Sequence, residues 1–175
     1  MLIYEALKKD HDALKPLLDR LVQSADADDA TRMALIGQIR DELVPHSRAE
    51  EAVFYNSLRS IDETKDLVMH GYAEHMEAET MLRALQGQEA VKVDWTTTAQ
   101  KLREALLHHI EEEEGRIFES ARQVLAEEEA IAMAEAFEQM KPEVREGGFM
   151  QNTLDLIANV MPQRFATPLR NFLHK

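Results

Sequence analysis

HSRAEEAVFY at residues 46–55 and HIEEEEGRIF at residues 109–118 decide the fold, because they carry one pattern twice. Each stretch opens on a histidine, has glutamates four and five positions later, and closes on an aromatic residue. A lone histidine precedes each stretch at matched spacing: His11 lies 35 residues before His46, and His75 lies 34 residues before His109. This duplication predicts two helical hairpins built on one plan.

The rest of the chain favours helices throughout. Apolar residues recur at spacings of three and four, and no segment alternates apolar and polar residues between tight turns. Polar or turn-forming residues interrupt the pattern at 24–29, 60–62 and 86–94, leaving four long segments with short connections. Short connections make neighbouring helices antiparallel. The predicted fold is therefore all-α, an up-down antiparallel four-helix bundle.

Histidines and glutamates interrupt the apolar seam of every predicted helix. The seams read Leu7, His11, Leu14, Leu18 in the first; Ile36, Ile39, Leu43, His46, Glu50, Val53 in the second; Val68, Tyr72, His75, Glu79, Leu82 in the third; and Leu102, Leu106, His109, Glu113, Ile117 in the fourth. These positions predict ligand-type side chains inside the core.

The spacing places these polar groups at one level of the bundle. Residues four apart on a helix share a face, separated by about 6 Å of rise, so His46/Glu50 and His109/Glu113 each pair an imidazole with a carboxylate. We expect each such pair to bind one ion. His46 lies 15 residues before Ile61 and His75 lies 14 after it, so antiparallel helices bring their rings level.

Burial of several imidazoles and carboxylates without partners costs several kcal/mol for each ionised group, on the order of the whole stability of a small domain. A pair of cations removes this cost. Histidine and carboxylate ligands without thiolate suit iron, and manganese or zinc are possible on ligand type alone. The Glu-x-x-His motif of ferritin-like di-iron bundles is absent, because no histidine has a glutamate three residues before it.

The pattern His…His-x-x-x-Glu…His…His-x-x-x-Glu resembles the hemerythrin-like, HHE cation-binding family over about residues 1–125. The resemblance implies a non-haem di-iron centre in a four-helix bundle, with bridging carboxylates from Glu50 and Glu113. The side chains at the family's ligand positions are His11, His46, Glu50, His75, His109 and Glu113.

Two departures from the oxygen-carrying members of this family affect the expected function. Those members have a second histidine one turn after the third-helix histidine, where this chain has Glu79, and an aspartate five residues after the last histidine, where it has Glu114. We expect a protein that reacts with or senses O2, peroxide or NO. An iron-responsive interaction module or an iron-holding protein without turnover is the alternative. Whether Glu79 or Glu114 ligates a metal stays open.

Composition excludes several other classes. The 175 residues suit one compact domain, and the 33 acidic against 20 basic residues give a net charge of -13. A protein surface that binds nucleic acid or an anionic membrane needs the opposite sign, so neither partner is expected. No cysteine is present, so disulfides, thiolate ligands and iron–sulfur clusters are excluded. No apolar run reaches membrane-spanning length, and the amino terminus lacks a signal-peptide pattern, which predicts a cytoplasmic protein.

Residues 126–175 are expected to form a helical extension to the bundle. An amphipathic stretch from Ala130 to Met140 meets a predicted stop at Lys141-Pro142, and later breaks at Gly147-Gly148, Pro162 and Pro168 favour additional short helices. The extension is predicted to pack on the bundle or to form a homo-oligomer contact through its apolar segment, 149–173. Elsewhere, His70 and His174 are interpreted as solvated, His108 as a surface group or a group that contacts a ligand, and Tyr72 as a packing residue.

Overall fold

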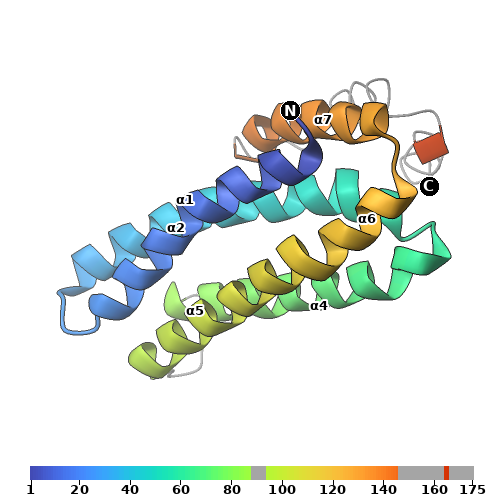
Figure 1. The fold of residues 1–175 in the computed structure, drawn as a ribbon. Coiled ribbons are helices and arrows are strands. Elements are labelled where there is room, and N and C mark those ends of the chain that lie inside the picture. Colours follow the sequence, from blue (N-terminus) through green and yellow to red (C-terminus); the bar gives the residue numbers. More distant parts are fainter. Residues whose placement is uncertain (88–93, 146–163, 166–175) are drawn as a thin grey trace, which may run out of the picture.

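The computed structural model describes residues 1–87, 94–145 and 164–165, and their long helices form the expected antiparallel bundle (Figure 1). The first helix is α1 (Ile3–Gln23). The second runs without a break through α2 (Asp29–Glu50), η1 (Glu51–Tyr55) and α3 (Asn56–Leu58), and the third is α4 (Asp62–Leu85). The fourth runs through α5 (Trp95–Glu112), η2 (Glu113–Ile117) and α6 (Phe118–Val124), and α7 (Glu127–Arg145) follows. The all-α prediction is confirmed.

The bundle helices begin and end where the sequence predicted. Asp28 caps α2 by accepting a hydrogen bond from the backbone N–H of Thr31 at 2.8 Å, and Asp94 caps α5 in the same way through Thr97 at 3.2 Å. None of the helices that the structure describes combines the length and apolarity needed to cross a lipid bilayer.

Two π-helical turns were not predicted. The backbone N–H of Asn56 donates to the carbonyl of Glu51, and that of Phe118 donates to Glu113, so each turn closes five residues back instead of four. Such wide turns in α-helices are frequent at functional sites. One follows Glu50 directly and the other begins at Glu113, so both turns lie beside the predicted carboxylate ligands.

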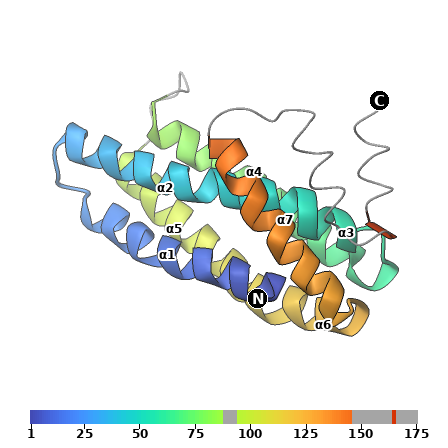
Figure 2. The ribbon, with the colours of Figure 1, turned by 90° about the horizontal axis from the view of Figure 1, so that it is seen from above.

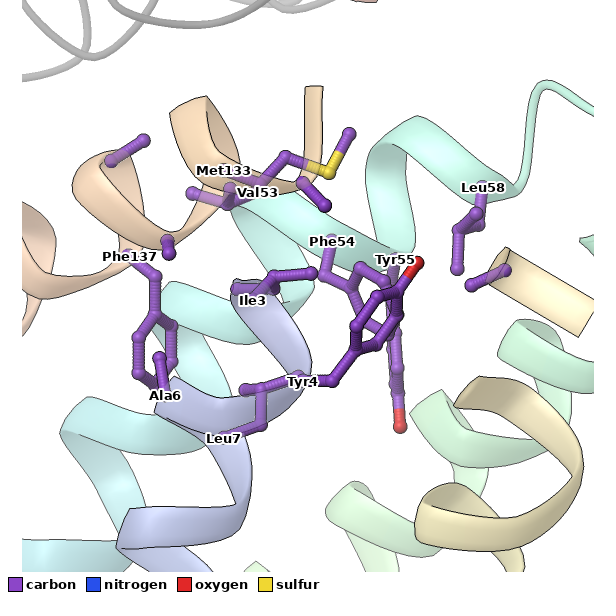
Figure 3. Packing of buried hydrophobic residues seen from close by; sticks show 14 of the residues in the cluster. Ile3, Tyr4, Ala6, Leu7, Val53, Phe54, Tyr55, Leu58, Met133 and Phe137 are labelled. Carbon is purple, nitrogen blue, oxygen red and sulfur yellow. The ribbon is translucent and has the colours of Figure 1, made fainter. Parts of the chain in front are cut away.

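The core is divided into two apolar clusters. The capped cluster, which includes Ile3, Tyr4, Phe54 and Phe137, lies under α7, and Figure 3 shows how closely these side chains interlock. The loop cluster lies toward the connection between α1 and α2. It includes Leu14, Leu18, Ile36, Ile39, Leu82 and Leu102. On α1, Leu7 belongs to the capped cluster and Leu14 to the loop cluster, so the polar layer containing His11 separates the two.

Helix α7 lies across α1 and α2 (Figure 2), and it continues past the stop predicted at Lys141-Pro142. That prediction was wrong because contacts hold the last turn: Val144 packs on the capped cluster, and Arg145 Nη2 donates to the Asp41 carbonyl at 3.1 Å. This carbonyl would normally accept from the residue four positions on, which is Pro45 and has no N–H. The later predicted breaks lie outside the described residues.

Candidate metal centre

The six predicted ligand side chains meet in one buried layer. All four long helices of the bundle contribute, and each of these residues is at most 5% exposed. The six are His11, His46, Glu50, His75, His109 and Glu113. The seam positions predicted from helical periodicity therefore face the interior, with Glu79 also buried at the edge of the layer.

The four histidines form two pairs. His11 and His46 face each other with ring centroids 5.0 Å apart, and His75 and His109 do so at 4.6 Å. Each ring directs Nδ1 outward to a carboxylate, which can only accept a hydrogen bond when ionised. Nδ1 therefore carries the proton, and in the neutral ring Nε2 presents its lone pair to the interior. The Nε2 atoms of His75 and His109 lie only 3.0 Å apart.

Glu50 and Glu113 lie between the two histidine pairs. Oε2 of Glu50 is 3.5 Å from His46 Nε2 and 3.4 Å from His75 Nε2. Oε2 of Glu113 is 3.2 Å from His11 Nε2 and 3.9 Å from His109 Nε2. Each carboxylate thus faces one histidine of each pair. Among the described residues, none of the four oxygens has a hydrogen-bond partner of suitable geometry.

Ligand atoms gather into two buried groups, with the atoms of each group within 4.8 Å of one another. One contains His11, His46 and Glu113, and the other contains Glu50, His75 and His109. The expectation that His46/Glu50 and His109/Glu113 would each define one ion site is therefore corrected. Histidines group by hairpin, but the carboxylate that completes each group comes from the opposite hairpin, because the antiparallel neighbour brings it closer.

Four outer carboxylates hold the histidines at Nδ1. The contacts are Asp10 to His46 at 3.3 Å, Glu114 to His11 at 3.1 Å, Glu51 to His75 at 3.0 Å, and Glu74 to His109 at 2.9 Å. Such partners orient a ligating imidazole and raise its basicity. They obey the internal repeat, since Asp10 and Glu74 each precede a lone histidine, and Glu51 and Glu114 each follow a central glutamate.

Comparison with known families agrees with this arrangement. The family model of the hemerythrin HHE cation-binding domain matches residues 2–121. The chain belongs to this family. Its members bind cations, and the two buried histidine–glutamate groups of this hemerythrin-like protein can each hold a metal ion.

Two known proteins are similar in sequence to this hemerythrin-like chain. An uncharacterized hemerythrin-like protein of Schizosaccharomyces pombe is 32% identical over 141 residues, a match that covers 79% of this chain and 68% of the relative. A DNA nickase of Nostoc sp. is 26% identical over 149 residues, covering 83% of this chain and 41% of the nickase. The chain therefore spans about two thirds of the first relative and less than half of the second.

Electrostatics of the hemerythrin-like centre reflect two buried carboxyls in contact. Burial, reinforced by the negative charge of Glu113, raises the pKa of Glu50 well above its usual value. Burial opposes ionisation of Glu113 too, but the neighbouring Glu50 carboxyl, which is the protonated one of the two, and His11 favour the charged form and hold the pKa of Glu113 below its usual value. Burial likewise disfavours a charged His11, but Glu113 and Glu114 raise its pKa to about 9. Protonation of Glu50 and of His11 therefore reduces the net negative charge of the buried layer.

Glu79 and Glu114, which the sequence left open, have other contacts. Glu79 pairs with Arg48 at 2.7 Å and with Arg83 at 3.3 Å, and it belongs to neither buried group. Glu114 binds the outer nitrogen of His11 and also pairs with Lys15 at 3.2 Å.

Tyr55 is a further residue of the site that the sequence did not identify, in addition to the outer carboxylates Asp10, Glu51 and Glu74. Its ring stacks on His75 with centroids 5.5 Å apart and an interplanar angle of 14°. Burial, with the negative charges of Glu113 and Glu50, raises the pKa of its hydroxyl well above the usual value. A Cβ at Gly71 would lie 2.6 Å from that hydroxyl, so glycine is needed for the ring to reach this position.

Tyr72, by contrast, donates to the Glu51 carbonyl at 3.0 Å and to Asn56 Oδ1 at 3.1 Å. These contacts agree with its interpretation as a structural residue. The sequence carried one signal for Tyr55: it closes the first repeated stretch where Phe118 closes the second.

Proposed function

We propose that this hemerythrin-like chain holds a non-haem pair of iron ions and reacts with or senses small oxidants, namely O2, peroxide or NO. The observation that carries the proposal is the buried layer in which four imidazoles direct Nε2 toward two carboxylates whose oxygens lack hydrogen-bond partners. Unpartnered carboxylate oxygens in a protein interior are costly, and cations would compensate them.

The donor set fits iron. Imidazole and carboxylate without thiolate suit iron, and also manganese or zinc. His11 and His46 would hold one ion, His75 and His109 the other, with Glu50 and Glu113 facing both. The 3.0 Å approach of the His75 and His109 Nε2 atoms supports a cation there, because two lone pairs repel at that distance.

The ligand count favours reactivity with exogenous molecules. Four imidazole nitrogens and four carboxylate oxygens make about eight donors, against about twelve positions on two six-coordinate ions. One turn after His75, α4 has Glu79 in place of a second ligating imidazole, and Arg48 and Arg83 engage its carboxylate. A pair of iron ions supplies one-electron redox chemistry and binding positions for a small oxidant.

The chain's own residues prepare the site for that role. The outer carboxylates keep the Nδ1 protons in place, so the inner nitrogens remain available as ligands. The two apolar clusters on either side exclude bulk water. Tyr55, stacked on His75, brings a hydroxyl to the same layer, and burial with the negative charges of Glu113 and Glu50 raises its pKa, so the group can donate a hydrogen bond but resists losing its proton.

An iron-holding or iron-responsive module without turnover is the second candidate. It is favoured by the complete burial of Glu50 and Glu113, which makes metal binding contribute to folding. The nicking activity named for the Nostoc relative is not carried over, because the net charge of -13 opposes the binding of DNA.

The test is anaerobic loading with Fe(II), metal analysis, and then measurement of O2 and peroxide consumption. We expect two irons per chain and prompt consumption of oxidant. Two irons with no consumption would replace the reactive function with iron holding. Fewer than two irons would contradict the pair itself.

A further inference from the structure

A second histidine–carboxylate cluster lies on the outer side of α4 and α5. His70 Nε2 is 3.5 Å from Glu74 Oε1 and 3.4 Å from Glu112 Oε2, and the ligand atoms of the three residues lie within 4.8 Å of one another. They line a surface pocket of about 190 Å³ that also includes Asp66 and Arg116. Two helices thus direct three ligand-type side chains to one point that a solvated ion can reach.

The sequence repeats the ligand spacing here. His70 and Glu74 are four residues apart, as are His108 and Glu112, so α4 and α5 each carry a His-x-x-x-Glu pair in addition to the buried ligands. His70 and His108 are both exposed, as predicted, but neither is isolated. His108 Nε2 lies 4.0 Å from the same Glu112 oxygen that faces His70.

The four outer carboxylates differ in whether a lysine or arginine pairs with them. Three of them are paired with a permanent cation: Asp10 with Lys141 at 2.8 Å, Glu114 with Lys15 at 3.2 Å, and Glu51 with Arg48 at 3.0 Å. Within the described part of the chain, no lysine or arginine pairs with Glu74, whose partners are histidines. Of the four outer carboxylates, Glu74 is thus the one that lacks a lysine or arginine partner among the described residues.

We propose that His70, Glu74 and Glu112 bind a divalent first-row metal ion at the surface, next to the buried centre. One imidazole and two carboxylates suit manganese, iron or zinc, with water completing the coordination. Glu74 contacts both the surface cluster and the buried centre: its Oε1 faces His70, and its Oε2 accepts from His109 Nδ1. The surface ion would supply to Glu74 the charge that lysine or arginine supplies elsewhere. This link to the buried centre rests on the proposed function, but the surface site does not.

A simpler interpretation is that His70 is a protonated partner of two glutamates. Arg116 helps to separate the two possibilities, because it donates to Oε1 of Glu112 at 3.0 Å and leaves Oε2 toward His70. Arg116 lines the same pocket, so its positive charge opposes a metal ion there. An ion site should bind metal more tightly when Arg116 is removed, whereas a plain ion pair predicts no metal binding to change.

The test is titration of the metal-free chain with Mn2+, counting free Mn2+ by electron paramagnetic resonance. We expect the wild-type chain to bind one more ion than His70→Ala or Glu112→Gln. Arg116→Gln should bind that ion several-fold more tightly. Glu77→Gln is the matched control, because it removes one charge from an exposed position of α4 outside the cluster and should leave the count unchanged.

The outcomes are distinguishable. Equal counts for wild type and His70→Ala would overturn the surface site. If the buried pair failed to bind metal, every variant would lose the same ions, and the one-ion difference at His70 and Glu112 would remain. His70 is exposed, so its replacement should leave the helical circular dichroism and the melting of the metal-free chain unchanged.

Discussion

The two halves of the buried layer share one ligand pattern and differ in what surrounds it. The His11/His46 half is covered by α7: Phe137 lies edge-on to His46 with centroids 5.6 Å apart, and Lys141 pairs with Asp10. The His75/His109 half has Tyr55 stacked on His75, and Glu74, which accepts from His109, lines the surface pocket. The histidine pairs of the two repeated hairpins thus lie in different surroundings.

The difference teaches that the ligands and their surroundings come from different parts of the chain. The ligands lie within residues 2–121, which the family model matches, whereas α7 begins at Glu127. This helix supplies the charge partner of one half through Lys141, which is itself largely buried against Phe137. The other half depends on exposed residues for the same purpose. The halves are therefore expected to bind metal with unequal affinity.

The largest effect should come from the carboxylates that both halves share. Glu50→Gln or Glu113→Gln should reduce the iron content from two ions per chain to one or fewer, because each carboxylate faces a histidine of each pair. Elemental analysis after anaerobic loading measures this. Glu79→Gln is the control and should keep both ions, since Glu79 pairs with arginines. Retention of both ions in either variant would show that the two halves do not depend on shared carboxylates.

Removal of metal should destabilise the whole layer. Metal at one hundred times its dissociation constant stabilises the folded state by about 2.7 kcal/mol for each ion. For a domain of this size, that corresponds to a rise in melting temperature of about 5 to 10 °C per ion. Thermal unfolding with chelator and with added Fe(II) tests the expectation. Coincident curves would count against buried ligation, and Glu50→Gln should respond less than wild type.

Lys141→Ala should have a smaller effect, limited to the affinity of the ion in the His11/His46 half. Loss of a group that hydrogen-bonds a ligating histidine typically weakens metal affinity by about 10- to 100-fold, and Lys141 acts one contact further out, so a smaller weakening is expected. Of the four outer carboxylates, Lys141 pairs with Asp10, which contacts His46, so one ion should bind more weakly while the other is unchanged. Stepwise competition with a chelator measures both affinities. Lys9→Ala is the control, since exposed Lys9 pairs with Glu138, at 3.9 Å, and with none of the outer carboxylates among the described residues. An equal loss of affinity for both ions would contradict the proposed difference between the two halves.

Much of the fold and the ligand set could be predicted because both follow from local periodicity. Helical spacing placed His11, His46, His75 and His109 on inward seams, and all four are buried. The repeat also contained the outer carboxylates, since Asp10 and Glu74 occupy equivalent positions, but their role depends on contacts between hairpins that spacing alone does not define.

Features that depend on packing between distant segments could not be predicted. The last turn of α7 forms despite Pro142 because Arg145 reaches the carbonyl that Pro45 leaves without a helical partner. The approach of Lys141 to Asp10 depends on how α7 crosses α1 and α2. The π-helical turns place one extra residue in a turn, which no residue type in these stretches signals. In the two cases that involve α7, tertiary contact outweighs local preference.

The smallest expected effect tests the aromatic difference between the halves. Tyr55→Phe makes the first repeated stretch end as the second does, on phenylalanine. Because the Tyr55 hydroxyl is buried without a hydrogen-bond partner of suitable geometry, its removal from the metal-free chain should stabilise the fold by about 1 kcal/mol. Tyr72→Phe is the matched control with the opposite sign: its hydroxyl donates to Glu51 and Asn56, so its loss should cost about 1 kcal/mol.

Urea unfolding of the metal-free proteins measures both changes, and metal analysis should find the ion content of Tyr55→Phe unchanged, because no ligand is removed. If Tyr55→Phe instead destabilised the metal-free chain as much as Tyr72→Phe, the hydroxyl would have a structural partner, and its position beside Glu113 would be a matter of packing. A stabilised variant that consumes oxidant more slowly would show that the unpartnered hydroxyl is kept for the reaction. The asymmetry between the halves would then extend from metal affinity to reactivity.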